Sequence, residues 1–348
     1  MERLSKQTFR VLAIDSDLDL LAELIPKGFP DLHEGKFPLR DWLRWKYSIS
    51  ANPFGSTIGF VSDVPSSFYG ILVRRYRFGQ TLLQVGLVVD VMTVPEARGK
   101  GLFVETARAA LDGLRDKSVA FTIGFPIRKD VMPGHLRLAW KPTFPVFVYF
   151  TPIGRASKKS PISLGLRALR LLLPRTAFPH PKTTHTSDLN IFLDSTRALR
   201  GKHAGVNADV AQLEKSDEFL RWRLAQPGVN YEFVVFRDGT KFAYAVCRVA
   251  SLSGTRSLAV VDIDGSDPSS VGSVVRALAD IAVTKHADLL VVSTNPSNAK
   301  RLGFLRSGLF KSPLKFTTIL RDVPNSNLEV AGISESQWRI TWLDSDTL

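Results

Sequence analysis

An internal repeat is the feature of this sequence that most restricts its fold. Residues 43–46 read LRWK, and residues 220–223, about half a chain length further on, read LRWR. In both copies a predicted helix gives way to an alternating strand, at 57–62 and at 231–237. Self-similarity at so long a period predicts one fold used twice. The length of 348 residues agrees, because it allows about two domains of ordinary size.

Further matches keep the same order along the two halves. Pro126 closes an apolar strand as Pro296 closes another, and the sequence WK at 140–141 corresponds to FK at 310–311. Trp45 and Trp222 recur with the repeat, so we expect them to be core anchors rather than ligand platforms. The order of the elements predicts an α/β fold with a mixed sheet. In the first half we expect strands at 9–14, near 57–62, 68–76 and 82–92, at 119–125 and near 146–150, a helical stretch at 18–47 and a helix at 102–115.

Four segments are predicted. Residues 1–152 and 186–323 form the two domains, 153–185 form a basic linker with a short helix, and 324–348 form a C-terminal tail. The net charge is +13, and the linker alone has 7 basic residues and no acidic residue. Because so much of the excess charge lies in the linker, without a basic face interleaved with aromatic residues, we expect no nucleic-acid partner.

Several classes of protein and site are excluded or disfavoured. Cys247 is the only cysteine, which excludes an internal disulfide and a Cys-rich zinc site. Only His180 and His185 are closely spaced among six histidines, so we expect no metal. The N-terminus lacks the apolar core of a secretory signal, and no uncharged run approaches the roughly 20 residues that span a bilayer. We therefore expect a cytoplasmic protein. Contact of the segment 160–175 with a membrane surface is the less favoured interpretation, because its leucines can pack on a domain.

The stretch 87–102 contains the most specific chemical signal. It passes from a β-rich apolar run through a turn with Pro95, Gly99 and Gly101 into a predicted helix. The first amides of a helix lack intrahelical partners and the dipole is positive there, so glycines that let an anion approach the backbone form a phosphate cradle. Arg98 and Lys100 add charge at its rim. The pattern is neither a P-loop nor the three-glycine dinucleotide fingerprint.

This stretch resembles the signature loop of the GNAT acyltransferase superfamily, which holds the pyrophosphate of acyl-coenzyme A. Glu96 departs from the family pattern, which usually has Gln or Arg there. The resemblance covers nearly all of 1–152, and the whole chain resembles tandem-GNAT proteins encoded with surface-polysaccharide genes. It implies two tandem GNAT-like domains, each a mixed, mostly antiparallel sheet flanked by helices. It also implies that acetyl-CoA or another acyl-CoA is bound by Met92, Thr93, Val94, Arg98, Gly99, Lys100, Gly101 and Leu102.

The second half lacks the features of this loop. Aligning Pro95 with Pro268 places the sequence RGKG at 98–101 opposite VGSV at 271–274, which has neither the charges nor the last glycine. A valine in that turn would crowd an approaching phosphate. We therefore predict that only the first half binds coenzyme A and that the second half supplies scaffold and walls of the acceptor site.

Acyl transfer to an amine needs a proton acceptor, an oxyanion donor and a proton for the leaving thiolate. The resemblance implies that the oxyanion donor is a backbone amide between about Val91 and Val94. Asp90, His135 and Tyr149 are the candidate catalytic side chains. Each has a simpler structural interpretation: the triplet VVD that ends at Asp90 recurs at 260–262, a lone histidine is more often a surface or capping residue, and a tyrosine in a closing strand is usually in the core.

The resemblance thus implies an acyl-CoA-dependent N-acyltransferase that acts on an amine of a small molecule or amino sugar, by direct attack in a ternary complex. One alternative is an aminoacyl-tRNA-dependent transferase that modifies a peptidoglycan precursor, although such relatives commonly lack the intact turn at 98–101. The other alternative is a non-catalytic binding or membrane-surface adaptor built on a silent GNAT fold.

Overall fold

The computed structural model describes residues 8–12, 14–29, 38–48, 50–61, 66–114, 117–153, 182–203, 210–323 and 330–345. The predicted linker helix and the segment 160–175 lie outside these residues. The first half contains β1 (Phe9–Val11), α1 (Ile14–Gly28), α2 (Leu39–Tyr47), β2 (Ser56–Val61), β3 (Ser67–Phe78), β4 (Thr81–Thr93), η2 (Pro95–Ala97), α3 (Leu102–Asp112), β5 (Val119–Gly124), η4 (Lys129–Val131), α4 (Met132–Arg137) and β6 (Lys141–Pro152).

The second half repeats this order. It contains β7 (Thr183–Thr186), α6 (Leu189–His203), β8 (Ala211–Leu213), α7 (Asp217–Leu224), β9 (Glu232–Asp238), β10 (Lys241–Leu252), β11 (Thr255–Gly265), α8 (Pro268–Thr284), β12 (Leu289–Thr294), α9 (Pro296–Arg301) and β13 (Phe310–Asp322). The last described segment contains η5 (Val330–Gly332), η6 (Glu335–Gln337), β14 (Trp338–Arg339) and η7 (Trp342–Asp344).

Most predicted strands form within one or two residues of their expected bounds, because their local signals are strong. The strand expected at 9–14 ends at Val11, the helix expected at 102–115 ends at Asp112, and the strand expected near 146–150 spans Lys141–Pro152. The strands expected at 68–76 and 82–92 are β3 and β4, and the helix expected at 102–115 is α3. The strands β10 and β11 are joined at Ser253 and Gly254, whose φ values of 49° and 76° suit a tight hairpin. The helical stretch expected at 18–47 is divided between α1 and α2.

The strands form one mixed sheet in which the two halves exchange a strand. Its order is β1-β2-β3-β4-β5-β13-β6-β12-β11-β10-β9-β7, so β13 of the second half lies beside β5 and β6 of the first half lies beside β12. Most pairings are antiparallel, with parallel pairs at β4–β5 and β11–β12. An isolated half would therefore lack a strand that completes its sheet.

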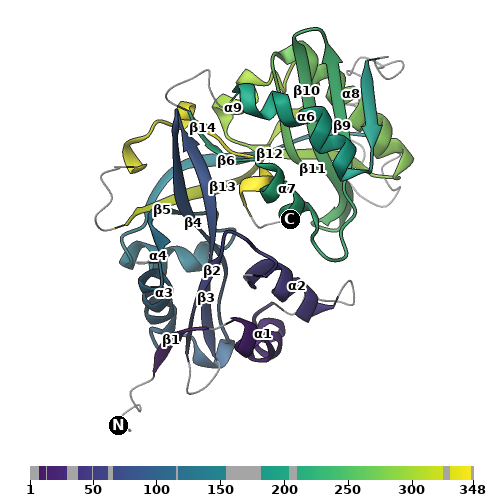
Figure 1. Ribbon diagram of the computed structural model, residues 1–348. Coiled ribbons are helices and arrows are strands. Elements are labelled where there is room, and N and C mark those ends of the chain that lie inside the picture. The colour runs from purple at the N-terminus through teal and green to yellow at the C-terminus, as the bar shows by residue number, and fades with distance from the viewer. Residues whose placement is uncertain are drawn as a thin grey trace.

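Helices cover both faces of this sheet. In the first half α3 packs on β2 and β3, and Figure 1 shows α1 on the opposite side of these strands. In the second half α8 packs on β9, β10 and β11. On the face of the sheet that carries α1, α2, α6 and α7, residues of both halves pack into one hydrophobic core. Leu21, Phe192 and Trp338 belong to it.

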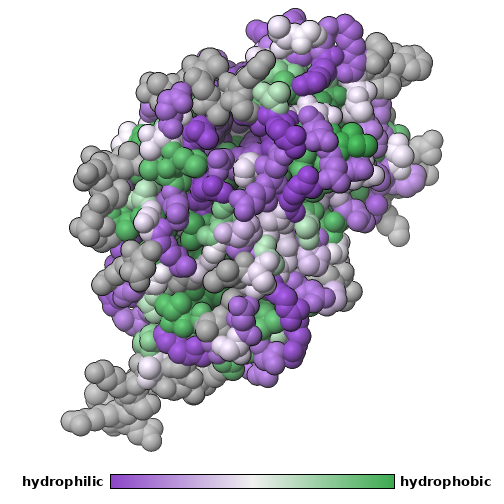
Figure 2. All heavy atoms as spheres, in the orientation of Figure 1, coloured by the Kyte–Doolittle hydropathy of each residue, from purple (hydrophilic) through white to green (hydrophobic). Residues whose placement is uncertain are grey.

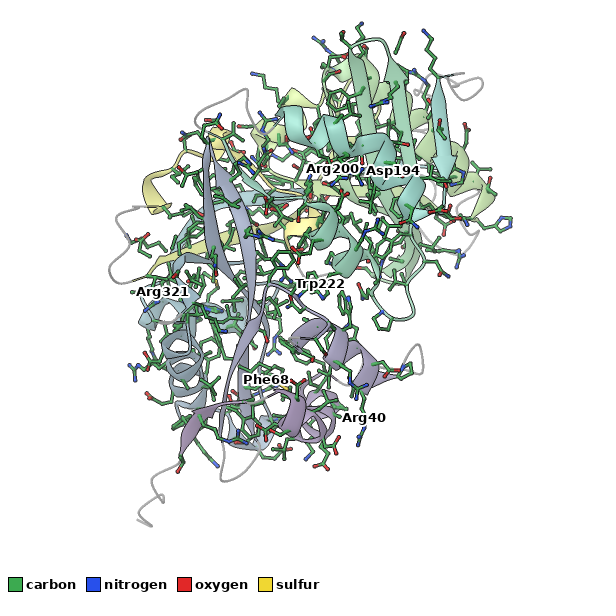
Figure 3. The ribbon with its side chains drawn as sticks, viewed as in Figure 1. Arg40, Phe68, Asp194, Arg200, Trp222 and Arg321 are labelled. Atoms are coloured by element: carbon green, nitrogen blue, oxygen red, sulfur yellow. The ribbon has the colours of Figure 1, made fainter. Side chains whose placement is uncertain are left out.

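Trp45 on α2 and Trp222 on α7 join the two halves, as the repeat predicts. Their rings stack at a centroid distance of 5.4 Å, and both are buried. Each indole Nε1 donates a hydrogen bond to the backbone carbonyl of the other tryptophan, at 2.7 and 2.8 Å. Figure 3 shows Trp222 at the junction between the halves. The recurrence of the motif at 220–223 thus reflects a reciprocal contact, which confirms the prediction that both residues are core anchors.

Replacing either tryptophan by phenylalanine tests this contact. Trp45→Phe and Trp222→Phe should each lower the free energy of unfolding by about 1–3 kcal/mol beyond the loss of ring area, because each leaves a buried carbonyl without its donor. Denaturant unfolding measures the change. Trp338→Phe is the matched control, because the Trp338 indole N–H is buried without a hydrogen-bond partner. Equal losses in all three variants would contradict the role of the reciprocal bonds.

Candidate functional site

The candidate site is the opening between β4 and β5. Their parallel pairing ends at Leu87 and Ile123, although β4 continues to Thr93. A cavity of about 300 Å³ occupies the space beyond this point. It is lined by both strands, by Phe29 after α1 and His135 on α4, and by Ile319 on the exchanged strand β13. The second half therefore contributes part of the wall of the first half's cavity.

A β-bulge in β4 lies at the cavity. Phe68 pairs with Met92 and Gly70 pairs with Val89, so Asp90 and Val91 together face the single residue between Phe68 and Gly70 on β3. Asp90 has a φ of 48°, in the left-handed region that non-glycine residues rarely occupy. Such strain is concentrated at functional sites. The irregularity therefore lies at Asp90 and Val91, at the beginning of the stretch expected to carry the oxyanion donor.

The Asp90 carboxylate lies against two buried polar side chains of α2. It forms an ion pair with Lys46 and accepts a hydrogen bond from the hydroxyl of Tyr47. The Lys46 side chain is completely buried, whereas that of Asp90 is 13% exposed and lines the cavity. The Lys46 Nζ also lies 4.4 Å from the centroid of the Trp42 ring. Sequence reasoning missed Lys46 and Tyr47, because they follow the tryptophan of a repeat that predicts only packing.

His135 also lines the cavity and is a buried, uncharged side chain. Its Nδ1 lies 3.3 Å from the hydroxyl of Tyr69, and Phe103 and Trp140 pack against its ring. Burial lowers the pKa of His135 from 6.5 to about 4. Burial also raises the pKa of Tyr69 well above 10, so its hydroxyl keeps its proton. At neutral pH the pair is therefore an imidazole hydrogen-bonded to a phenol.

The predicted phosphate cradle has the conformation that the sequence indicates. Gly99 and Gly101 have φ values of 77° and 79°, and a Cβ at either would meet no atom within 4 Å. Gly101 is the N-cap of α3 and no side chain caps the helix there. Arg98 donates from Nε to the carbonyl of Thr93, and both Arg98 and Lys100 are exposed. The turn is thus an open, glycine-lined helix N-terminus with two cations at its rim.

Three of the other residues predicted to bind the donor have buried side chains. Met92, Val94 and Leu102 bury their side chains in the core, and the Thr93 hydroxyl lies 3.0 Å from that of Ser67. Only the backbone of the three buried residues can face a ligand.

The second-half residues that the repeat places opposite 98–101 do not form a turn: 271–274 lie inside α8, where Val271 and Val274 are buried in the core, so the expectation that a valine crowds a phosphate there is wrong. The N-terminus of α8 is closed by a side chain instead. Asp267 is the N-cap of α8, and its carboxylate accepts hydrogen bonds from the amides of Ser269 and Ser270 at 2.9 and 3.1 Å. These and further hydrogen bonds from serine hydroxyls hold the pKa of Asp267 well below its usual range. A carboxylate therefore already occupies the position at which the first-half turn offers backbone amides.

Tyr149 does not lie in the cavity. The strand β6 crosses into the second half, where Tyr149 pairs with Val292 on β12 and packs on Phe304 at a centroid distance of 5.3 Å. It belongs to the hydrophobic core beneath α8. The expectation that Tyr149 serves the first-half site assumed that β6 stays in the first half's sheet, and the strand exchange removes that assumption.

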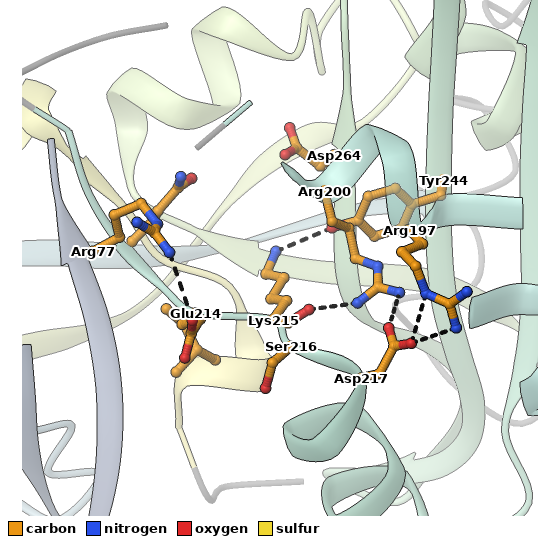
Figure 4. Close-up of a pocket in the computed structure, with 11 residues that line it drawn as sticks. Arg77, Arg197, Arg200, Glu214, Lys215, Ser216, Asp217, Tyr244 and Asp264 are labelled. Atoms are coloured by element: carbon orange, nitrogen blue, oxygen red, sulfur yellow. Dashed lines mark hydrogen bonds and ion pairs between the residues drawn. The ribbon is translucent and has the colours of Figure 1, made fainter. Parts of the chain in front are cut away.

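A larger cavity of about 350 Å³ lies near the junction of the halves (Figure 4). Most of its charged side chains pair with one another, Arg197 and Arg200 with Asp217 and Arg77 with Glu214. Its Lys215 and Asp264 pair with Asp262 and Arg301, which lie outside the lining. Figure 2 shows mainly hydrophilic residues over the centre of the visible face. The helix that begins at this cavity, α7, is capped by the side chain of Ser216, and the neighbouring strand β8 pairs with both β3 and β14. The β4–β5 cavity is therefore the better candidate for a donor site.

Other kinds of site find little support. Among the residues that the structure describes, no three histidine, cysteine, aspartate or glutamate side chains are grouped closely enough to hold a metal ion. Cys247 is buried, and burial raises the pKa of its thiol, which disfavours it as a nucleophile. In the described part of the chain, no helix is both long and apolar enough to cross a membrane.

Comparison with known proteins identifies the fold. No family model and no curated protein matches the sequence. A GCN5-related N-acetyltransferase from Anabaena variabilis ATCC 29413 superposes with a TM-score of 0.61 at 11% identity, covering 91% of this chain and 73% of that chain. A conserved protein of unknown function from Enterococcus faecalis V583, called a probable N-acyltransferase, superposes with a TM-score of 0.60 at 11% identity, covering 92% and 73%.

A GCN5-related N-acetyltransferase from Kribbella flavida superposes with a TM-score of 0.55 at 15% identity, covering 91% of this chain and 71% of that chain. At these identities the likeness defines the fold alone. The chain has the α/β fold of GCN5-related N-acetyltransferases, with a mixed, mostly antiparallel sheet flanked by helices, which confirms the predicted fold class.

The buried pair Lys46–Asp90 can be tested by a double-mutant cycle. Lys46→Met should lower the free energy of unfolding by about 3–5 kcal/mol, because it leaves a largely buried carboxylate without its cation. Adding Asp90→Asn to Lys46→Met should recover part of this loss. Arg40→Met, which removes an exposed partner of Asp19, is the control and should cost less than about 1 kcal/mol. Strictly additive single-variant losses would contradict a coupled pair.

The buried His135 predicts a pH dependence of stability. Because its pKa falls from 6.5 to about 4 on folding, the unfolded chain binds the proton more readily. The contribution of neutral His135 should be complete above pH 6.5 and should decline as the pH falls toward 4, by about 3 kcal/mol in total. His135→Gln should remove this part of the pH profile, whereas His286→Gln, at an exposed histidine, should leave it unchanged. An unaltered profile in His135→Gln would contradict the assignment.

Proposed function

We propose that this protein is an acyl-CoA-dependent N-acyltransferase with one donor site, in the first half. The observation that carries the proposal is the combination, on β4 and the turn after it, of an unpaired strand edge, a strained bulge at Asp90 and an uncapped glycine turn before α3. These features together suit an extended ligand with a phosphorylated end. The strand edge can form hydrogen bonds with the amide groups of the ligand, and the turn can bind its phosphates.

The proposed donor lies along β4 with its pyrophosphate at residues 98–101 and its thioester at the bulge. Arg98 and Lys100 compensate the phosphate charge at the rim, and the amides at Gly99 to Leu102 donate to its oxygens. Coenzyme A supplies the acyl group as a thioester. The strained backbone at Asp90 and Val91 is our candidate for the oxyanion donor, in place of the wider range 91–94.

The acceptor amine attacks the thioester carbonyl carbon, the C–N bond forms and the C–S bond breaks. Asp90 is our candidate for accepting the amine proton, because its carboxylate is the acidic group that lines the cavity. Lys46 and Tyr47 hold that carboxylate in place and act as positioning residues. In the tautomer in which Tyr69 donates to Nδ1, His135 carries its proton on Nε2 and can provide a hydrogen bond to the leaving sulfur.

The acceptor is proposed to be an amine of a small molecule or amino sugar. Phe29 borders the cavity and directly follows α1, the helix that Figure 1 shows on the side of the sheet opposite to α3. Donor and acceptor would thus approach the bulge from the two faces of the sheet. Transfer by direct attack follows from this arrangement, since the described cavity contains no cysteine or serine nucleophile.

The proposal is tested by thiol release from acetyl-CoA with a panel of amines, comparing two glycine variants. Gly101→Ala should weaken acyl-CoA binding by about ten- to a hundredfold, because its Cβ enters the cradle and disturbs the amides that bind phosphate. Gly254→Ala is the matched control, because Gly254 has a φ of 76° and similarly open surroundings but lies in the β10–β11 turn.

Both variants incur a similar backbone cost, of about 1 kcal/mol, so a difference between them reports the ligand rather than the fold. Equal donor affinity in the two variants would overturn the cradle. If the protein binds acyl-CoA but releases no thiol with any amine of the panel, the proposed donor site stands and the proposed transferase activity is wrong.

A further inference from the structure

The second half has a counterpart of the β4–β5 opening. The parallel pairing of β11 with β12 ends at Val260 and Val292, each within one residue of the repeat equivalents of Leu87 and Ile123. Beyond these residues the two strands do not pair with each other. We call the space between the unpaired ends of β11 and β12 the slot. Unlike the β4–β5 opening, it is filled by another part of the chain. The segment 330–345 lies between the strands: the Thr341 hydroxyl donates to Asp262 on β11, and the Thr294 hydroxyl at the end of β12 donates to the carbonyl of Ile340, at 3.1 and 2.6 Å.

The slot recognises the backbone of this segment. Asn295, just after β12, donates from Nδ2 to the carbonyl of Trp338 at 3.0 Å and accepts from the amide of Ile340 at 3.1 Å. One side-chain amide therefore binds both backbone groups that flank Arg339, as a strand would. This contact depends on an extended backbone and not on the side chain of Arg339.

An acidic side chain fixes the register of the segment. The Glu335 carboxylate accepts hydrogen bonds from Asn295 Nδ2 at 2.6 Å and from the Ser297 amide at 3.0 Å, and a third from the Ser297 hydroxyl. Glu335 and Ile340 are thus bound by the same asparagine. The carboxylate comes from the 3-10 turn η6, and the extended part of the segment begins at Trp338. A ligand for this slot is therefore a peptide that is extended at the clamped groups and has a carboxylate, on a preceding helical turn, three residues before the first clamped carbonyl.

The segment also contacts the first half. Trp338 packs on Phe78, Phe121 and Phe144 at centroid distances of 5.6, 6.1 and 5.6 Å. The Tyr76 hydroxyl on β3 donates to Asp344 at 2.8 Å. Figure 1 shows the yellow C-terminal segment passing between the two halves. A peptide bound in the slot therefore connects the second half to the tips of β3 and β5.

We propose that the slot between β11 and β12 is a peptide-binding site whose ligand is the chain's own segment 330–345. The segment occupies the position that remains open between β4 and β5, and so closes the second half to an extended ligand from solution while fastening the halves together. This inference does not depend on the proposed acyltransferase activity, because none of the contacts that carry it involves Asp90, His135 or the turn at 98–101.

The test separates the segment from the chain without removing it. Residues 324–329, which lie outside the described part of the structure, are replaced by a protease recognition sequence in the full-length protein, which is then cleaved. The released peptide should remain bound through gel filtration, and a fluorescent synthetic peptide of residues 330–348 should exchange with it. Fluorescence anisotropy gives the affinity of the peptide without any use of coenzyme A.

Two changes should weaken binding by at least tenfold: Asn295→Ala in the protein and Glu335→Gln in the peptide. Ser336→Ala in the peptide is the matched control, because Ser336 is exposed and, among the described residues, its hydroxyl forms a hydrogen bond with Ser334 of the segment itself. Dissociation of the unaltered peptide during gel filtration, with no change in the melting temperature of the remaining protein, would overturn the proposal. So would equal affinity for Asn295→Ala.

Hydrogen exchange on the uncleaved protein provides a second measurement that does not require the cleaved form to stay folded. The amide of Ile340 should be protected, and Asn295→Ala should increase exchange across 338–345 while the strands β2 to β4 keep their protection. An unprotected segment in the unaltered protein would also overturn the proposal.

Discussion

The antiparallel pairing of β6 with β13 is the contact on which the rest of the structure depends. It places a second-half strand beside β5 and a first-half strand beside β12, so neither half has a complete sheet by itself. The common core beneath α1, α2, α6 and α7 and the reciprocal hydrogen bonds of Trp45 and Trp222 follow from it. Ile319 reaches the candidate donor cavity by the same exchange. The second half therefore has a structural role towards the first, because its strand β13 completes the first half's sheet and contributes Ile319 to the wall of the candidate cavity.

The two halves use equivalent positions in opposite ways. After β4 the helix N-terminus is a glycine without a side-chain cap, and the strand edge borders a cavity. After β11 the helix is capped by Asp267, and the strand edge is covered by the segment that contains Ile340. Buried backbone groups need partners. At α8 the second half satisfies them with the Asp267 side chain, whereas at α3 no such cap is formed by the described residues. This difference is the basis for proposing one donor site in the chain.

Local patterns predicted what depends on local physics. The elements, the glycine turn at 98–101 and the anchoring role of the recurring tryptophans follow from periodicity, turn chemistry and repetition. The strand exchange could not be predicted, since an alternating strand has the same sequence pattern whichever neighbour it pairs with. That is why Tyr149 was expected at the wrong site. Lys46 was missed because a lysine on a helix ordinarily faces water, and its burial depends on Asp90, more than forty residues away. The position of the tail could not be predicted either, because residues 324–348 show no hydrophobic periodicity that would place them between β11 and β12.

Titration calorimetry of the intact protein with acetyl-CoA tests the central claim most directly, because it counts donor sites without requiring the acceptor. The account predicts saturation at one equivalent per chain, with binding that weakens as salt screens the phosphate contacts at Arg98 and Lys100. Binding of two equivalents per chain would show that the second half is open to donors. Absence of binding would remove the basis for an acyl-CoA site in the first half.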